Sequence, residues 1–274
     1  MFDSHCHLQD KRIFGRVDEI VRNARNVGVG RMLCCGSEAA DWADVARIGA
    51  GYGGAVVCAY GVHPWYVGGT AVDNTADNGN GADKINGANS INNDWMAALE
   101  KYLTNDPSAA VGEIGLDHTV SPRNDDCQKD IFIRQLKIAE RHKRPVSIHC
   151  RKAWGDLLSI LRDTGGLRYG GAIHSYSGPP DLVGQLEDMG CSISFSGSIL
   201  IPGSRRAAES VRKVSPRKLL AETDSPDILP QGAPGPHNEP LNLPMVINRM
   251  AEILGETPEN IAASTHSNAT ALFC

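Results

Sequence analysis

Short apolar runs recur along the whole chain and are rich in Val, Ile, Leu, Cys and Ala. Because polar residues do not alternate within them, these runs predict strands that are buried on both faces, as in a parallel sheet. Eight runs have this character and are the predicted strands: 1–3, 32–35, 56–61, 109–114, 146–149, 172–174, 192–195 and 219–222.

Between most of these runs lies a stretch in which apolar residues have helical spacing. In 128–144, Phe132, Leu136 and Ala139 recur at four- and three-residue intervals, and Pro145 then ends the predicted helix. Similar stretches predict helices at 156–162, 180–189, 207–214, 243–254 and 258–273. Alternating strands and helices indicate a parallel α/β fold, and eight repeats favour a closed TIM (β/α)₈ barrel over an open doubly wound sheet.

The segment 68–93 does not follow this pattern. It is rich in Asn, Gly and Asp and poor in large apolar residues, so burial cannot offset the entropy lost on ordering it. We predict an exposed insertion between the third strand and its helix. A tolerated surface insertion is the favoured interpretation, and a substrate lid is the alternative. Together with this insertion, residues 1–274 are predicted to form a single domain.

Composition narrows the class of protein. The chain has 274 residues, 41% of them hydrophobic, but it has no apolar run long enough for a membrane span. It does not open on a basic and then apolar segment, so no secretory signal is expected. Eight scattered cysteines without C-x-x-C spacing suggest reduced thiols. We therefore expect a cytoplasmic protein, with the nucleus or mitochondrion as alternatives, and no obligate protein partner is evident.

The formal charge of −5 argues against a protein that coats nucleic acid non-specifically. It does not exclude a nuclease, because bound cations can neutralise an acidic site and local basic residues can still meet phosphates.

Histidines and carboxylates stand where five of the predicted strands end. In a barrel these ends form one face, and active sites lie on that face. We predict that this face holds divalent metal ions and that the ligands are His5, His7, Glu113, His149, His174 and Asp224.

The spacing of these residues suggests how they share the ions. His5 and His7 are two apart on a strand, so both imidazoles point to the same side. Glu113 lies among small apolar residues, where an ionised carboxylate is costly unless a cation or a Lys or Arg partner compensates it. Glu113 could bridge two ions, one completed by His149 and His174 and the other by His5, His7 and Asp224. Mixed nitrogen and oxygen ligands suit Zn²⁺ or Mn²⁺ better than Mg²⁺, although the metal stays open.

Two such ions, about 3.5–4 Å apart, suit the hydrolysis of phosphate esters by an activated water. Asp224 could also accept a proton from that water, and Glu222 could support a ligand or face the substrate. Arg151 could contact a phosphate, with a structural salt bridge as the alternative. His63 could contact substrate or form a structural hydrogen bond, and Asn238 is predicted to bind substrate.

The motifs that carry these residues resemble those of the TatD-like metal-dependent deoxyribonucleases and span nearly the whole chain. They are Asp3-Ser-His5-Cys-His7-Leu8, Gly61-Val-His63-Pro64, Gly112-Glu113-Ile-Gly-Leu-Asp117, Pro145-Val-Ser-Ile-His149-Cys-Arg151, His174-Ser-Tyr-Ser-Gly178, Glu222-Thr-Asp224-Ser-Pro226 and Asn238-Glu239-Pro240. The resemblance implies a TIM barrel, the same six ligands with Glu113 shared by two ions, and cleavage of DNA, often from the 3′ end. Two positions that are commonly aromatic in relatives are His118 and Asp227 here.

The function predicted from the sequence is therefore divalent-metal-dependent hydrolysis of DNA phosphodiester bonds, as a 3′–5′ exonuclease. RNA is an alternative substrate. Some members of the family are described as removing D-amino acids from mischarged tRNA, so a D-aminoacyl-tRNA deacylase, or another ester or amide hydrolase on the same metals, is the rival enzyme. Many amidohydrolases carry a carboxylated Lys on the fourth strand, whereas this chain has Glu113, which favours the phosphoester. A barrel retained only as a scaffold is the third hypothesis.

Overall fold

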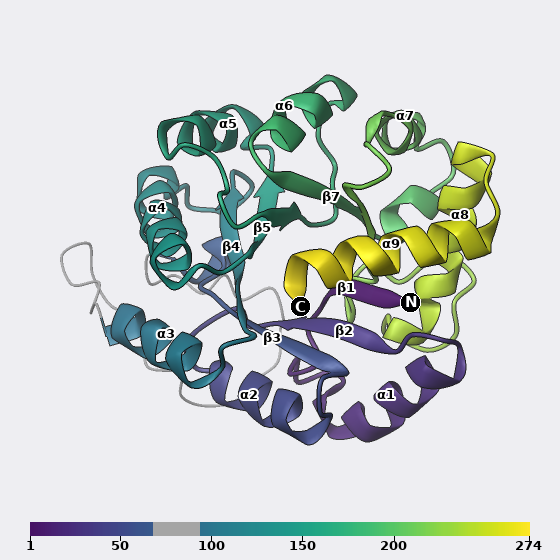
Figure 1. Cartoon of the computed structure of the whole chain (residues 1–274), viewed down its shortest axis with the longest axis horizontal. Coiled ribbons are helices and arrows are strands. Elements are labelled where there is room, and N and C mark those ends of the chain that lie inside the picture. The colour runs from purple at the N-terminus through teal and green to yellow at the C-terminus, as the bar shows by residue number, and fades with distance from the viewer. Residues whose placement is uncertain (68–93) are drawn as a thin grey trace.

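The computed structural model describes residues 1–67 and 94–274, and in them eight parallel strands are hydrogen-bonded in the order β1 to β8. Each predicted strand is present, and the predicted TIM (β/α)₈ barrel is confirmed (Figure 1). The insertion predicted at 68–93 lies outside the described residues. The strands are β1 Phe2–Cys6, β2 Arg31–Cys35, β3 Val56–Tyr60, β4 Ala110–Asp117, β5 Val146–Arg151, β6 Gly171–Ile173, β7 Cys191–Phe195 and β8 Leu219–Ala221.

The seam between β8 and β1 is closed partly by backbone and partly by side chains. The Asp224 N–H donates to the carbonyl of His5 at 3.0 Å, and Cys6 forms a parallel bridge with Ser225. Below this bridge, the buried Asp3 carboxylate accepts the backbone N–H and the hydroxyl of Thr223. This seam fixes the first predicted ligand strand against the loop that carries Asp224.

Helices surround the barrel on the outside (Figure 1). Among the described residues they are α1 Val17–Asn26, α2 Trp42–Gly51, α3 Asp94–Asn105, α4 Asp125–His142, α5 Trp154–Asp163, α6 Val183–Asp188, α7 Arg205–Lys213, α8 Leu243–Leu254 and α9 Pro258–Phe273. The last two have the predicted bounds. No helix in the described part of the chain has the length and apolarity needed to cross a bilayer.

Several bounds differ from the sequence prediction, and three of the differences have a clear physical reason. Strands β1 and β4 continue to Cys6 and Asp117 because their polar residues, which interrupt the apolar pattern, are nonetheless buried in the sheet. Helix α4 ends at His142 because Lys143 adopts a left-handed backbone with φ 56°, and the residue before Pro145 is disfavoured in a helix.

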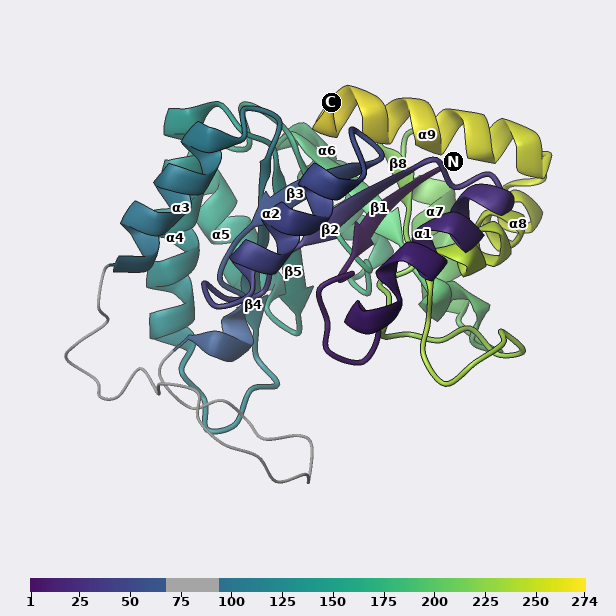
Figure 2. The same cartoon turned by 90° about the horizontal axis from the view of Figure 1, so that it is seen from below.

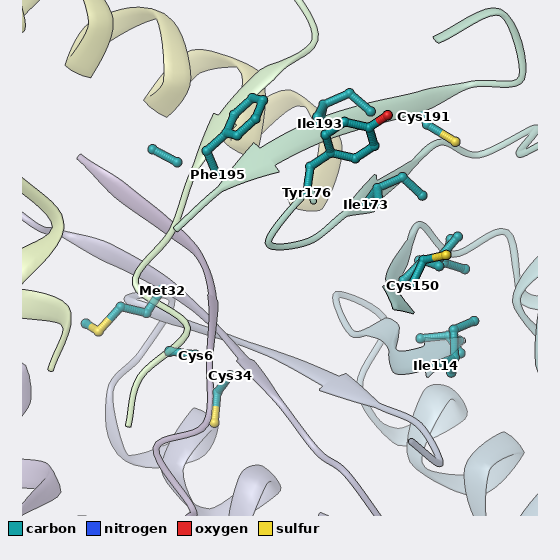
Figure 3. Close-up of a cluster of buried hydrophobic side chains, with 14 of the residues drawn as sticks. Cys6, Met32, Cys34, Ile114, Cys150, Ile173, Tyr176, Cys191, Ile193 and Phe195 are labelled. Carbon is teal, nitrogen blue, oxygen red and sulfur yellow. The ribbon is translucent and has the colours of Figure 1, made fainter. Parts of the chain in front are cut away.

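The apolar side chains form two cores. The outer core lies between the strands and the surrounding helices and includes Met32, Ile114 and Phe195 (Figure 3). The inner core fills the barrel with Phe2 and other residues of the strands. Phe273 on α9 joins this inner core, and α9 lies across the end of the barrel where the strands begin (Figure 2). The opposite end, where the strands lead into loops, is left for polar residues.

Candidate metal centre

The six predicted ligands converge at the end of the barrel where the strands lead into loops, and so lie on one face. His5 and Glu113 lie within β1 and β4, and His149 lies within β5. Within the described residues, three groups place their ligand atoms within 4.8 Å of one another: His5 with His174 and Asp224, His5 with His7 and Glu113, and Glu113 with His63 and His149.

One oxygen of Glu113 faces the ligands from the first and last strands. Oε2 lies 3.4 Å from Nε2 of His5 and 3.3 Å from Nε2 of His7. The two imidazole nitrogens are 3.2 Å apart, and Oδ1 of Asp224 lies 3.9 Å from each. These four side chains therefore surround one point with two nitrogens and two carboxylate oxygens.

The other oxygen of Glu113 faces a second group. Oε1 lies 2.9 Å from Nδ1 of His149, 2.7 Å from Nε2 of His174 and 3.3 Å from Nε2 of His63. The His149 and His174 nitrogens are 3.1 Å apart. The carboxylate of Glu113 thus stands between two sets of donors, as a bridging ligand does.

These donors fit divalent cations. Two ligands about 2.0–2.1 Å from a tetrahedral ion lie about 3.3 Å apart, close to the separations around Glu113. Oε1 is buried and has no hydrogen-bond partner, although three imidazole nitrogens lie near it. Burial alone raises the pKa of Glu113, but the charges of His63, His174 and His5 outweigh it and hold the pKa well below the usual range. A buried carboxylate is costly when one of its oxygens lacks a hydrogen bond. A cation bound between this oxygen and the imidazoles would compensate that cost.

Contacts behind the imidazoles fix which nitrogen faces the centre. Nδ1 of His7 donates to the carbonyl of Cys35 at 2.7 Å, so its Nε2 presents a lone pair. Nδ1 of His5 contacts the hydroxyl of Ser147 at 2.9 Å. Such contacts orient metal-binding histidines and raise their basicity.

Asp117 performs the same task for His149 and was not among the predicted site residues. Its Oδ2 lies 3.2 Å from Nε2 of His149 and accepts the indole N–H of Trp65 at 2.9 Å. Burial raises the pKa of Asp117, but hydrogen bonds from His149, Thr119 and Trp65 outweigh it and lower the pKa overall. The sequence held one signal, because Asp117 follows Glu113 at a spacing that places both on the same side of β4.

His63 is buried against Glu113, and its ring is hydrogen-bonded to the backbone of Trp65. Nδ1 accepts the backbone N–H of Trp65 at 3.1 Å, so the neutral ring carries its hydrogen on Nε2, which faces Glu113. Burial, the largest effect, lowers the pKa of His63 to about 4, so the ring is neutral at ordinary pH. Of the two roles that the sequence left open, this arrangement suits the hydrogen bond.

Glu222 and Asp224 follow β8 but have different surroundings. Oε1 of Glu222 is buried, accepts the Ser175 N–H at 2.6 Å and lies 3.4 Å from Nδ1 of His174. Asp224 adopts φ 57°, which turns its carboxylate toward His5 and His7. Burial, together with the charge of Glu222, raises the pKa of Asp224 against the opposing charges of the histidines.

The two remaining predicted residues, Arg151 and Asn238, differ in exposure. Arg151 ends β5 with an exposed side chain, and within residues 1–67 and 94–274 no carboxylate lies within ion-pair distance of its guanidinium. Asn238 is fully buried instead. It donates to the carbonyls of Thr223 and Ile228, and its oxygen accepts the backbone N–H of Glu239 and the side chain of Asn242. These bonds hold the loop after β8 and leave the amide little capacity for substrate.

Comparison with known proteins agrees with this geometry. The family described as TatD related DNase matches residues 2–274. The chain is 27% identical over 273 residues to the uncharacterized metal-dependent hydrolase YabD of Bacillus subtilis, covering 100% of this chain and 98% of YabD. It is 28% identical to a Pantoea vagans protein named 3′-5′ ssDNA/RNA exonuclease TatD, covering 100% of this chain and 99% of that protein.

Among solved structures, the TatD homologue YJJV of Escherichia coli superposes with a TM-score of 0.85 at 26% identity, covering 100% of this chain and 97% of YJJV. The match of the family description to almost every residue, together with a metal-binding cluster at the expected end of the barrel, leads to one conclusion. The chain belongs to the TatD-related DNase family of metal-dependent hydrolases.

Proposed function

We propose that this protein is a divalent-metal-dependent deoxyribonuclease that removes nucleotides from the 3′ end of DNA. One observation carries the proposal: the two oxygens of Glu113 face two separate groups of donors. In this proposal two ions are held, one by His5, His7 and Asp224 and the other by His149 and His174, with Glu113 shared between them. Zn²⁺, Mn²⁺ and Mg²⁺ are the ions to be tested, and the nitrogen-rich ligands favour the first two.

Divalent cations bound there would supply positive charge beside a phosphate and bring the pKa of a water molecule toward neutrality. Other residues of the protein have separate roles in the proposed reaction. Asp224 is the general base, because its carboxylate lies beside both His5 and His7 and is slightly open to the loops. Glu222 lies behind His174 and orients it, and His63 packs against Glu113 with its Nε2 3.3 Å from Oε1.

Arg151 is the proposed contact for a phosphate oxygen. Its side chain is exposed at the end of β5, two residues after His149, and it pairs with no carboxylate of the described chain. A guanidinium can donate two parallel hydrogen bonds to a phosphate. Asn238, in contrast, is proposed to act only through the loop after β8 that it supports.

The full-length relative from Pantoea vagans supports this choice of substrate, because its name specifies a 3′–5′ exonuclease on single-stranded DNA and RNA. RNA is therefore tested beside DNA. Cleavage of D-aminoacyl-tRNA is measured in the same preparations, since an ester of that kind is the rival substrate.

The test uses protein that has been stripped of metal and reloaded with Mn²⁺, Zn²⁺ or Mg²⁺. Single-stranded DNA labelled at its 5′ end is expected to shorten progressively, and phosphorothioate linkages at the 3′ end are expected to stop this shortening. A double variant, His149→Ala with Asp224→Ala, is expected to be inactive, whereas His266→Ala in α9 serves as the matched control. Equal cleavage by the double variant and the unchanged protein would mean a contaminating nuclease, and deacylation without DNA cleavage would favour the rival.

A further inference from the structure

Trp65 is the one Phe, Tyr or Trp of the described residues whose side chain is classed as exposed, at 44%. It lies in the short 3₁₀ turn Pro64–Tyr66 that follows β3. Burying a tryptophan side chain is strongly favourable, so a ligand that covers this indole would gain free energy.

The exposed indole stands beside the proposed metal centre. Its ring centroid lies 4.8 Å from that of His63 and 6.5 Å from that of His149. Its N–H donates to Oδ2 of Asp117, and the same oxygen contacts His149. The ring is therefore held by one edge, in a fixed position, against the carboxylate that orients a proposed metal ligand.

Two other exposed apolar side chains lie at the same end of the barrel. In the described ranges the large hydrophobic residues that are strongly exposed are Trp65, Val27, Ile201 and Leu229. Ile201 and Leu229 follow β7 and β8, as Trp65 follows β3, whereas Val27 lies between α1 and β2 at the opposite end. An exposed aromatic ring beside a polar centre suits a substrate that has both charged and flat apolar parts.

We propose that Trp65 is a stacking platform that takes one nucleobase of the substrate beside the metal centre. This inference rests on the proposed function. It concerns the base of the substrate, whereas the metal centre recognises the phosphate. Aromatic side chains stack on any base, because every base has a π-face. The platform thus accepts all four bases, and it requires the base to leave its partner strand, so single-stranded 3′ ends are preferred over paired ones.

Two substitutions separate stacking from anchoring. Trp65→Phe keeps an aromatic ring but loses the N–H that binds Asp117, and Trp65→Gln keeps an N–H donor but loses the ring. Base stacking corresponds to about a 5- to 150-fold change in affinity. We expect Trp65→Gln to raise KM for a single-stranded oligonucleotide by a factor in this range with little change in kcat, and Trp65→Phe to stay close to the unchanged protein.

A substrate with abasic sugars at its 3′ end makes the test specific. On that substrate Trp65→Gln is expected to match the unchanged protein, because there is no base to stack. Val27→Gln, which replaces an exposed apolar side chain at the other end of the barrel, is the matched control. Unchanged KM in Trp65→Gln, or an equal loss of kcat in both Trp65 variants, would overturn the platform and leave Trp65 as a support for Asp117.

Binding can also be followed without turnover. Trp42 and Trp95 are buried and Trp154 is half-buried, so quenching by a stacked base should act mainly on Trp65. Adding dAMP to the metal-loaded protein is expected to quench tryptophan fluorescence, deoxyribose 5-phosphate is not, and Trp65→Phe should abolish the signal. Quenching in a protein that cleaves no DNA would retain the platform and reject the nuclease, whereas DNA cleavage without quenching would do the opposite.

Discussion

The two ends of the barrel are built from the same eight strands but hold opposite kinds of side chain. Where the strands begin, Phe2 and its neighbours in the inner core are apolar and buried, and Phe273 of α9 packs with them. Where they end, imidazoles and carboxylates crowd together, and buried oxygens of Glu113 and Glu222 lack hydrogen-bond partners. The difference is visible within single strands, since β4 carries Ala110 into the apolar end and Glu113 into the polar one.

The end where the strands begin therefore serves mainly the stability of the fold, and the end where they lead into loops serves the chemistry. Apolar packing at the α9 end stabilises the fold and places no demand on the polar end. Unpartnered buried polar atoms at the loop end cost free energy in the protein alone and are compensated when a ligand binds. Substitutions at the two ends should therefore change different measurements, and the predictions below test this from the largest expected effect to the smallest.

Glu113→Gln is expected to have the largest effect, on activity rather than on folding. The amide cannot offer two anionic oxygens to the two groups of donors that Glu113 faces. Charge stabilisation by metal ions is worth several kcal/mol, so activity should fall by about 10³-fold or more. Metal content by elemental analysis should drop below that of the unchanged protein, with circular dichroism showing retained helices. Full metal content and activity would remove Glu113 from the centre.

Phe273→Ala is the corresponding change at the other end. Phe273 is buried, and its ring lies 6.4 Å from that of Phe2. Removing such a ring costs about 3–5 kcal/mol, which for a chain of this size lowers Tm by about 6–20 °C. Calorimetry should show this loss, while activity per folded molecule and metal content stay unchanged. Phe273→Leu, which fills most of the space, is the control and should lose less. Impaired metal binding in the folded variant would contradict the separation of the two ends.

The positions of the predicted ligands could be derived from the sequence because a parallel barrel brings the ends of all its strands together. His149 and His174 end apolar runs that are readable as strands. The barrel fold by itself therefore places their side chains at the same end. The same criterion ended the first strand at residue 3 and the fourth at residue 114, which is too early, because the polar His5 and Asp117 interrupt the apolar pattern although both are buried within β1 and β4.

The residues behind the ligands were harder to derive. Asp117 belongs to a motif that was noted in the sequence, but its role depends on which nitrogen of His149 faces Glu113, and a sequence does not contain that information. Asn238 was expected to meet substrate because it lies near the mouth. Its amide instead donates hydrogen bonds to backbone carbonyls of its own loop. These bonds depend on the backbone conformation of the loop, which the sequence does not give.

Asp117→Asn should weaken the polar end without removing a ligand. The change takes away the anionic partner of Nε2 of His149 and keeps an oxygen that can accept from Trp65. Loss of a partner of this kind reduces metal affinity or activity by about 10- to 100-fold. Metal titration followed by activity assays at saturating metal will show which quantity changes. The neighbouring Thr119→Val, which removes a hydroxyl bonded to the other oxygen of Asp117, should have a smaller effect in the same direction.

Thr257→Ala is the smallest and most local change, and it tests whether α9 acts only through stability. The Thr257 hydroxyl accepts the backbone N–H of Asn260 at the start of α9, where Pro258 occupies the first turn. Loss of such a cap costs about 1 kcal/mol, and Thr257→Ser should restore most of it because serine caps helices equally well. Chemical denaturation should detect the loss. Since Ala269 and Phe273 of α9 lie in the inner core where the strands begin, KM and kcat should equal those of the unchanged protein. A change in KM together with this small loss of stability would mean that the two ends are coupled through the strands, and the division between them would then not hold.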